Sequence, residues 1–548
     1  MRVFFVLFFV VVFQVSFAQE HKGDNIYVVS LKDKHIVNSS NPLSFLSQRA
    51  IDRRERKGIG ITESDIPISI DYIQAIKDLN YKIVCRSKWL NTLVVSGLPR
   101  SKQILSDLDF VLSVSKVERT KEHSEKIFFK NESEVEKYDI GGTHVKNSNK
   151  YDYGDSYTQI SALNADSVHN MGYDGKGVII AVLDAGYRKA NSMPVFDSLW
   201  DNNQILGTRD FVIPEGDVFS DNIHYHGFSV LSLMGGNIPG EIIGTAPKAS
   251  YYLFRTEDAN SEYLLEEYYW VAAAEYADSL GVDIINSSLG YTQFDNPVDN
   301  HTYADMDGNT TPITVGADIA ASKGIIVVNS AGNSGTTDWK YIGAPADGDN
   351  VFTVGAIDVL GNYADFSSVG PTSDGRVKPD VVALGRGVLV ASSNGGTVRG
   401  NGTSYSSPLI AGMMACMVQA FPYVSNSVIM DAVRESSSCF NTPDTLLGYG
   451  LPDFMKAMNL ISAEQEDYSG KKCFALGRNP VMNNLFIFYY KLPEQAYVKI
   501  FNFRGALVYS GPLSGSNNVI DISFLRRGMY FISVSGVDFS DIEKFIKI

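Results

Sequence analysis

The sequence predicts an α/β fold in the middle of the chain, with a parallel sheet flanked by helices. It also predicts a small α/β domain before this region and a small all-β sandwich after it. Between residues 177 and 385, short apolar runs rich in β-branched residues alternate with helical stretches, which is typical of parallel strands buried on both faces. After residue 473, apolar and polar residues alternate with a period of two and glycines mark the turns, which is typical of a β-sandwich.

Polar residues stand at the ends of several predicted strands in the central region. Asp184, Asn286 and Asn333 each come at or just after an apolar run. Functional side chains of parallel sheets gather at the carboxyl ends of the strands, so we expect these three residues near one site. The predicted strands are GVIIAVLD, VDIINSSLG, GIIVVNSAGN, VFTVGAID and DVVALG, and the predicted helices include SEYLLEEYYWVAAAEYADSLG and ITVGADIAASKG.

The flanking segments divide the chain into further units. Residues 19–117 are expected to form the N-terminal domain, with strands NIYVVSL, YKIVCRS, NTLVVSGL and FVLSVSKV and a helix IDYIQAIKDLN. A basic stretch within it, RAIDRRERK, is interpreted as a solvated helix face. The polar segment 118–154 is predicted to be a linker to the central domain at 155–461. A second predicted linker, 462–472, precedes the β-rich domain at 473–548.

Charge and the first residues indicate an exported protein. The 548 residues carry a formal net charge of −15, which argues against a nucleic-acid partner because such proteins present a basic face. Residues 1–18 have one arginine, a short apolar run and the ending Ser16-Phe17-Ala18, the pattern of a secretory signal peptide. Gln14 interrupts the run, which argues against a permanent transmembrane anchor. We therefore predict a secreted or surface-attached protein.

The cysteines do not indicate a disulfide-built fold. Cys85, Cys416, Cys439 and Cys473 are scattered and lack the spacing of a metal site. Cys439 and Cys473 could pair in an oxidising compartment, whereas Cys416 lies in an apolar helical pattern and is predicted to be in the core.

The stretch NGTSYSSPLIAGMM at 401–414 predicts a helix that starts with a serine at a tight corner. Free N–H groups and the helix dipole would favour negative charge beside Ser404, and Gly402 would let another backbone approach. Pro408 is near enough to the helix start to be tolerated. A serine at this place is more commonly an N-cap. Nucleophilic attack by Ser404 would need a base, an orienting acid and an oxyanion donor from elsewhere.

Three other residues meet these requirements. His226 begins the apolar helical run of HYHGFSVLSLMGG, Asp184 ends a buried strand, and Asn333 follows a strand in NSAGNSG. Imidazole can serve as the base, a carboxylate can hold the imidazole, and an amide can donate to an oxyanion. Taken singly, each also has a structural explanation, such as a loop-capping aspartate or a turn asparagine. His224 and His226 do not have the spacing of a zinc motif.

Together these motifs resemble the subtilisin-like serine proteases, the subtilases. The order Asp, His, Asn, Ser with VLDAG, HG, NSSLG, SAGN and GTSYSSP is similar to that family over roughly 155–458, and KPDVVALG and GTAPKASYYLFR match further segments. The resemblance implies that Asp184 orients His226, which acts as general base and then as general acid. It implies that Ser404 is the nucleophile and that Asn333 donates to the oxyanion beside the Ser404 N–H.

The same resemblance implies which residues contact a substrate. A cleft edge that pairs with an extended peptide should be formed by Ser288, Leu289 and Gly290. The primary specificity pocket should be bordered by Ala331 and Gly332.

The chain departs from the family pattern at two places. Ala185 stands where the family usually has threonine or serine, and residues 228–232 differ from the usual sequence after His-Gly. These changes concern packing and pocket shape rather than the type of reaction. The resemblance implies that no cofactor is needed for the chemistry. Structural calcium is common in the family, but DMDGNT at 305–310 is better explained as a plain turn.

Both flanking domains also resemble parts of exported proteases. FLSQRAIDRR at 45–54 and SKWLN at 87–91 resemble the inhibitory propeptide of proteases from Bacteroidetes. Asn479-Pro480, VKIFNFRG, GMYFISVSG and KFIKI resemble a type IX secretion sorting domain. The expected partners are therefore protein or peptide substrates, the chain's own propeptide as inhibitor, and the type IX secretion machinery.

The leading hypothesis is a secreted serine endopeptidase that is made as an inactive precursor. A catalytically silent surface binding protein with the same fold is the alternative, because the helix after His226 is altered. An α/β-hydrolase esterase would need Gly-x-Ser-x-Gly and the order Ser, Asp, His, and the chain has neither. A purely structural adhesin would give Asp184, His226, Asn333 and Ser404 no reason to coexist.

Overall fold

The computed structural model describes residues 25–34, 41–97, 102–117, 149–469, 474–476, 481, 484–489, 496–513, 518–535 and 540–548. The predicted signal peptide at 1–18 and most of the predicted linker at 118–154 lie outside these residues. Among the helices that the structure does describe, none combines the length and the apolar character needed to cross a bilayer.

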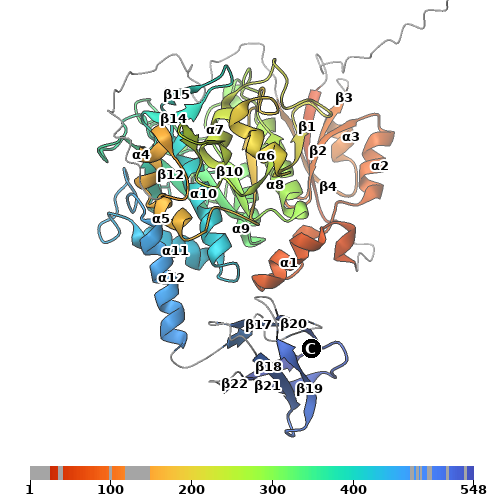
Figure 1. The fold of residues 1–548 in the computed structure, drawn as a ribbon. Coiled ribbons are helices and arrows are strands. Elements are labelled where there is room, and N and C mark those ends of the chain that lie inside the picture. Colours follow the sequence, from red (N-terminus) through yellow and green to blue (C-terminus); the bar gives the residue numbers. More distant parts are fainter. Residues whose placement is uncertain are drawn as a thin grey trace, which may run out of the picture.

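A seven-stranded parallel sheet forms the centre of the largest domain (Figure 1). Its strand order is β13-β12-β11-β10-β5-β9-β6, and every neighbouring pair runs parallel. The predicted parallel sheet is therefore confirmed. Its strands are β5 (Ile179–Asp184), β6 (Ile205–Asp210), β9 (Ser250–Arg255), β10 (Ile284–Ser287), β11 (Ile326–Ser330), β12 (Val351–Ile357) and β13 (Val381–Leu384).

Helices cover both faces of this sheet, which explains why its central strands are apolar at nearly every position. On one face lie α7 (His226–Gly235) and α10 (Thr403–Ala420), which share a core with Val182 and Val328 of the sheet. On the other face lie α8 (Leu265–Leu280) and α9 (Pro312–Ser322), whose core includes Trp270 and the opposite side of the same strands. Trp270 is fully buried, and burial of a large apolar side chain stabilises the fold by about 1.5–3 kcal/mol.

The strand order of the sheet reverses between β5 and β10, which are neighbours. After β5 the chain adds β6 and then β9, which lies between β5 and β6, and it then returns to add β10, β11, β12 and β13 on the other side. A reversal of this kind opens a crevice at the carboxyl ends of the two central strands, where ligands of such sheets bind. Asp184 ends β5 at this crevice, and Ser288 follows β10 there.

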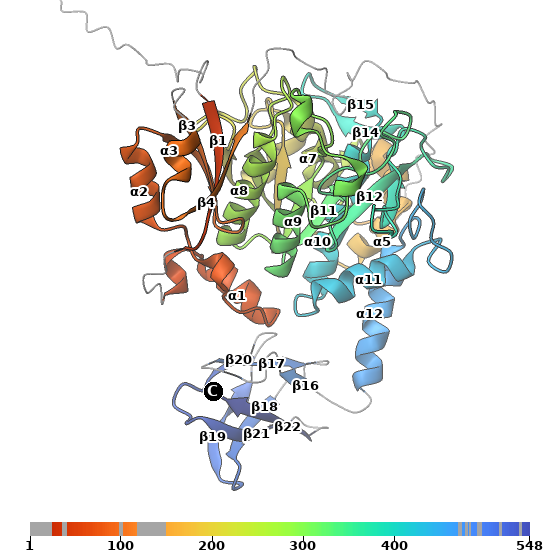
Figure 2. The same cartoon turned by 180° about the vertical axis from the view of Figure 1, so that it is seen from behind.

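The N-terminal domain is a four-stranded antiparallel sheet of order β2-β3-β1-β4. One face packs on its own helices, and the other packs on α8 of the central domain through Val28 and Val94 against Leu265 and Tyr269 (Figure 2). All four strands and the helix at 70–78 were predicted. The elements are β1 (Asn25–Leu31), α1 (Gln48–Arg56), α2 (Ile70–Asp78), β2 (Lys82–Ser87), β3 (Thr92–Gly97), α3 (Lys102–Ser106) and β4 (Val111–Val117).

The interpretation of the basic stretch as a solvated helix face is wrong. The stretch does form a helix, α1, but Arg53 and Arg54 are 0% and 1% exposed. Both guanidinium groups contact Asp278 of the central domain. The sequence pattern of α1 shows only that the helix carries many charges. It contains nothing about the acidic partner, which lies more than two hundred residues away.

The C-terminal region forms two antiparallel sheets, β16-β17-β20 and β19-β18-β21-β22, around one apolar core, as predicted for a β-sandwich. Helix α12 (Phe454–Ser469) extends into the segment predicted as the linker at 462–472. The strands are β16 (Phe474–Leu476), β17 (Asn484–Tyr489), β18 (Ala496–Asn502), β19 (Leu507–Leu513), β20 (Asn518–Asp521), β21 (Gly528–Ser535) and β22 (Ser540–Lys547).

Several smaller elements complete the central domain. Two short antiparallel pairs, β7-β8 and β14-β15, were not predicted. Cys416 is fully buried in α10, as expected. Among the cysteines that the structure describes, Cys85, Cys416 and Cys439 have free thiols. Cys473 lies outside the described residues. The smaller elements are α4 (Tyr157–Ser161), α5 (Ala165–Asn170), α6 (Asp197–Asp201), α11 (Asn426–Ser436), β7 (Asn237–Ile238), β8 (Ile242–Ile243), β14 (Val388–Ala391) and β15 (Thr397–Gly400).

Candidate active site

Asp184 and His226 form a buried acid–imidazole pair at the crevice. Nδ1 of His226 lies 2.8 and 3.0 Å from the two carboxylate oxygens of Asp184, and Ala185 N donates to Oδ1 at 2.7 Å. The two residues are 0% and 5% exposed. A carboxylate on Nδ1 holds the proton on that nitrogen, which leaves Nε2 as the acceptor. The ring can therefore take a proton from a group that faces Nε2.

The close approach of α7 to the end of β5 depends on Gly227. A Cβ atom on this residue would lie 2.6 Å from the carbonyl oxygen of Gly186 and 2.9 Å from Cβ of Asp184. Real Cβ atoms essentially never lie within 3.0 Å of a non-bonded heavy atom. The glycine after His226 is therefore required for the Asp184–His226 hydrogen bond to form.

Ser404 lies in the first turn of α10, next to the strand that ends at the crevice. Its Oγ donates to the carbonyl oxygen of Ser288 at 3.5 Å, and Oγ of Ser288 donates to the Ser404 carbonyl at 3.0 Å. Asn286 is buried within β10 and accepts a hydrogen bond from Ser407 Oγ at 3.1 Å, so it fixes α10 to the sheet. The ring of His226 stacks on that of Tyr405, with centroids 6.2 Å apart. Ser404 and His226 thus begin two helices that pack on each other.

Asn333 faces the same turn from the loop after β11. Its Oδ1 accepts hydrogen bonds from the backbone N–H and the hydroxyl of Thr403, both at 2.9 Å. A Cβ atom on Gly402 would lie 3.6 Å from Nδ2 of Asn333 and 3.7 Å from the backbone N of Ser404. Two N–H donors therefore border the space in front of Gly402. A negative oxygen placed there would be stabilised by both donors.

The predicted substrate-contacting residues lie around this centre. Ser288 and Leu289 are buried, Gly290 is half-buried, and the Leu289 carbonyl accepts a hydrogen bond from Asn329 at 3.0 Å. Ala331 forms a small apolar cluster with Ile342 and Ala346. The N–H of Gly332 donates to the hydroxyl of Thr403 at 3.2 Å, which links that loop to the start of α10.

The unusual residues after His226 are accommodated inside α7. Ser229 Oγ donates to the carbonyl of Ala391 at 3.3 Å, and Ser232 Oγ accepts from the N–H of Ala391 at 3.0 Å. Both serines are fully buried. These bonds tie α7 to β14 and leave the Asp184–His226 pair in place. His224 has its own structural role, because its Nδ1 accepts a hydrogen bond from the N–H of His226 at 3.2 Å.

A buried tyrosine supports the end of β5. Tyr187 donates through its hydroxyl to the carbonyl of Val182 at 2.5 Å and contacts that of Phe254 at 3.2 Å. Burial and the negative charge of Asp184 raise the pKa of Tyr187 well above its ordinary value. The phenol therefore stays neutral and keeps its donor.

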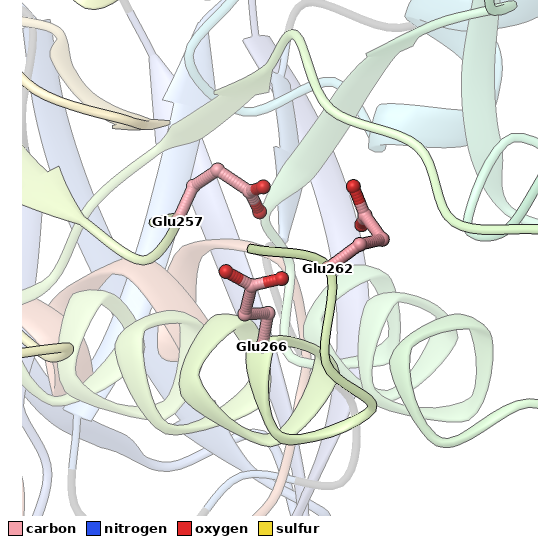
Figure 3. A group of neighbouring side chains, drawn as sticks. All are labelled: Glu257, Glu262 and Glu266. Atoms are coloured by element: carbon pink, nitrogen blue, oxygen red, sulfur yellow. The ribbon is translucent and has the colours of Figure 1, made fainter. Parts of the chain in front are cut away.

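Three carboxylates converge beside the cleft edge. Glu257 follows β9, Glu262 lies in the loop before α8, and Glu266 is in the first turn of α8 (Figure 3). Glu257 accepts from the hydroxyl of Tyr291 at 2.5 Å, and Glu266 accepts from the N–H of Tyr263 at 3.0 Å. These bonds give Glu257 and Glu266 structural partners, and we assign no metal to the cluster.

The aspartates of the segment 305–310 form hydrogen bonds with the local backbone. The Asp305 carboxylate accepts from the N–H of Thr302 at 2.7 Å, and that of Asp307 accepts from Asn309 and Thr310 at 2.8 and 2.9 Å. Asp305 and Asp307 thus cap the local backbone.

The contact that Glu275 of α8 makes with the N-terminal domain was not predicted from the sequence. Glu275 accepts hydrogen bonds from the hydroxyl of Ser87 at 2.5 Å and from the N–H groups of Lys88 and Trp89 at 3.0 and 2.9 Å. Trp89 is 6% exposed and belongs to the core on the α8 side of the sheet. Burial raises the pKa of Glu275, and the three donors oppose that rise. A glutamate amid the alanines of an apolar helix was the signal available in the sequence.

Three family models match parts of this chain. Residues 175–450, half of the chain, match the model of the subtilase family. Residues 26–132 match the peptidase S8 propeptide domain of Bacteroidota, and residues 479–548 match a secretion system C-terminal sorting domain.

Individual relatives align with about half of this chain. The chain is 29% identical to subtilisin DY of Bacillus licheniformis over 296 residues, 53% of this chain and 94% of that protein. It is 30% identical to subtilisin NAT of Bacillus subtilis subsp. natto over 285 residues, 51% of this chain and 65% of that protein. Among solved structures, MycP1 from Mycobacterium smegmatis has a TM-score of 0.43 at 22% identity, covering 57% of this chain and 86% of that one.

Proposed function

Because this chain belongs to the subtilase family of serine endopeptidases, we propose that Asp184, His226 and Ser404 form its catalytic triad. The observation that carries this proposal is the hydrogen bond of 2.8 Å between Asp184 and His226, beside the helix that begins at Thr403 and Ser404. The chain also carries a propeptide domain and a C-terminal sorting domain. It is thus an exported protease precursor, either secreted or held on the outer cell surface.

The proposed reaction has two halves. In the first, Ser404 Oγ attacks the carbonyl carbon of a peptide bond while Nε2 of His226 takes the hydroxyl proton. The tetrahedral oxyanion is held by Nδ2 of Asn333 and the backbone N–H of Ser404. When the C–N bond breaks, His226 gives the proton to the leaving amine and an acyl-enzyme remains on Ser404. In the second, water deprotonated by His226 hydrolyses that ester and Ser404 regains its proton.

The substrates are proposed to be proteins or peptides bound as an extended strand. Ser288, Leu289 and Gly290 form the edge for backbone pairing, and Ala331 and Gly332 border the pocket for the side chain before the cut bond. The propeptide domain is proposed to inhibit the precursor, and the sorting domain is proposed to be recognised by the type IX secretion machinery. These assignments follow the family resemblance residue by residue.

The test compares the full precursor with its Ser404→Ala variant. The readouts are precursor mass, casein hydrolysis and labelling by a fluorophosphonate probe that reacts with activated serines. We expect the parent chain to mature, digest casein and take the label, and the variant to do none of these. A folded parent that takes no label, even after its propeptide is removed, would contradict the triad and favour a silent binding protein.

A further inference from the structure

Helix α1 of the propeptide domain docks where two helices of the protease domain end (Figure 2). The C-cap of α8 is Gly281 and the C-cap of α9 is Lys323. The last carbonyl groups of a helix lack partners within the helix and form the negative end of its dipole. Two such ends side by side favour cationic groups.

The paired arginines of α1 fill this place. Arg53 donates to Oδ1 of Asp278 at 2.5 Å, to the carbonyl of Val282, and to the carbonyl of Lys323 at 3.3 Å. Arg54 donates to Oδ2 of Asp278 at 2.6 Å and to Oδ1 of Asp65 at 2.9 Å. The side chains of Arg53 and Asp278 are both 0% exposed. One carboxylate of the protease domain thus holds two guanidinium groups of the propeptide.

The shape of the protease surface is adapted to this helix. Gly281 has φ of +83°, and a Cβ atom there would lie 2.8 Å from the backbone N of Ala50. Gly324 has φ of +87°, and a Cβ atom there would lie 2.8 Å from Cδ1 of Ile59. Both glycines suit the left-handed conformation that ends a helix. They also let the propeptide backbone and side chains come close.

Further polar contacts surround the buried pair. Arg49 donates to Oδ2 of Asp283 at 2.5 Å and to the carbonyl of Gly281 at 3.0 Å. Lys323 Nζ lies 3.1 Å from Asp65, and Lys57 donates to Asn426 at 2.6 Å. Charges of both signs are therefore contributed from both domains.

The docking site of α1 lies at the amino ends of the central strands, whereas the proposed catalytic residues lie at their carboxyl ends. The end of α8 leads through Gly281 directly into the start of β10, whereas Ser288 follows the end of β10. The contacts of α1 thus lie apart from the cleft.

We propose that the ends of α8 and α9 form a guanidinium-binding site, centred on Asp278, that keeps the propeptide domain bound after the linker is cut. The occupant is α1 of the chain's own propeptide. The inference rests on the proposed function, because a protease precursor is what such a cut would mature. Loss of the propeptide would leave Asp278 and the helix-end carbonyls without these donors, so dissociation is opposed at this site as well as at the cleft.

The experiment uses the full Ser404→Ala chain with a recognition sequence for an added, sequence-specific protease inserted between residues 118 and 148. After cutting, the rate at which the propeptide domain leaves is measured by size-exclusion chromatography at successive times. We compare the reference chain with Arg53→Met/Arg54→Met. The matched control is Lys82→Met/Arg86→Met, which removes two exposed positive charges from β2 of the same domain.

We expect the Arg53→Met/Arg54→Met domain to leave at least about 100-fold faster, because breaking a buried ion pair is costly, and the control to leave within about twofold of the reference rate. Equal rates for all three chains would overturn the proposal. Melting curves of the uncut chains check folding. If the double variant does not fold, Lys323→Met replaces it, with about tenfold faster release expected and an unchanged rate as the contradicting result.

This test does not depend on catalysis, since every chain lacks Ser404. Failure of the proposed triad would be seen in the fluorophosphonate labelling of the parent chain. Failure of the guanidinium site would be seen only in the release rates. The two outcomes are therefore distinguishable.

Discussion

The side-chain oxygen of Asn333 accepts two hydrogen bonds from Thr403, one from its N–H and one from its hydroxyl, each 2.9 Å long. Because Oδ1 is engaged in this way, Nδ2 points to the space in front of Gly402, where the N–H of Ser404 also lies. The residue before the proposed nucleophile thus orients the proposed oxyanion donor. A shift of the α10 start would move both groups together.

We expect Asn333→Ala to lower kcat by about 10²–10³ with little change in KM, because the amide acts on the oxyanion and not on the ground-state substrate. Thr403→Val keeps the side-chain volume and removes one of the two bonds that orient Asn333, so about a tenfold fall is expected. Steady-state kinetics on a peptide substrate measures both. The control is Asn350→Ala at an exposed position. An unchanged kcat in Asn333→Ala would contradict the assignment.

Asp184→Asn should lower kcat by about 10⁴ without unfolding the protein. An amide in place of the carboxylate can donate to Nδ1, which would put the imidazole proton on Nε2 and remove the base. The rate of fluorophosphonate labelling measures this step directly. Asp217→Asn, at an exposed loop position, is the matched control. Labelling of Asp184→Asn at the parent rate would show that Asp184 does not set the tautomer.

Gly227→Ala should separate α7 from the end of β5. The added Cβ would meet the Gly186 carbonyl oxygen at 2.6 Å, so the helix must move. We expect a loss of about 1–3 kcal/mol in the free energy of unfolding, together with a large loss of activity. Urea unfolding of the Ser404→Ala precursor and labelling of the active chain measure the two effects. Gly60→Ala is the control, because a Cβ atom there meets nothing within 4 Å. Equal stability of the two variants would refute this reading of the His-Gly pair.

Asp65 should make the stability of the precursor depend on pH in the acid range. Burial acts to raise the pKa of Asp65, but the hydrogen bond from Arg54, with help from Thr62 and Lys323, outweighs it and lowers the pKa to about 2. The carboxyl of the unfolded chain, near 3.8, binds its proton at higher pH than the folded one. The contribution of Asp65 is therefore complete above about pH 4 and is lost as the pH falls toward 2.

Asp65→Asn should accordingly lower the free energy of unfolding by about 1–3 kcal/mol at pH 7 and by less near pH 2.5. Urea unfolding of the Ser404→Ala precursor at several pH values measures the difference. The exposed Asp52 offers a control in Asp52→Asn on α1. A difference between parent and Asp65→Asn that is the same at pH 7 and pH 2.5 would contradict the linkage.

Local patterns sufficed to predict the main elements, and the order of the motifs supplied the family resemblance that nominated the site. Central strands such as β5 are continuous apolar runs because helices cover both faces of the sheet, and that burial is visible in the sequence itself. Asp184, His226, Asn333 and Ser404 stand at strand ends and helix starts, which the same patterns locate. The structure brings Asp184 to His226 and Asn333 to the turn of Ser404.

Patterns could not show which distant partner a side chain meets. Arg53 and Arg54 look solvated in a charged helix, and only the tertiary fold puts Asp278 and two helix ends against them. Glu275 likewise acquires its role from the N–H groups of Lys88 and Trp89. Propensity and hydrophobic periodicity act over a few residues, so the sequence by itself determined the elements, and the order of its motifs supplied the family resemblance from which the chemistry was inferred. Burial of a charge depends on groups far away along the chain, so the docking of the propeptide was decided by the tertiary structure alone.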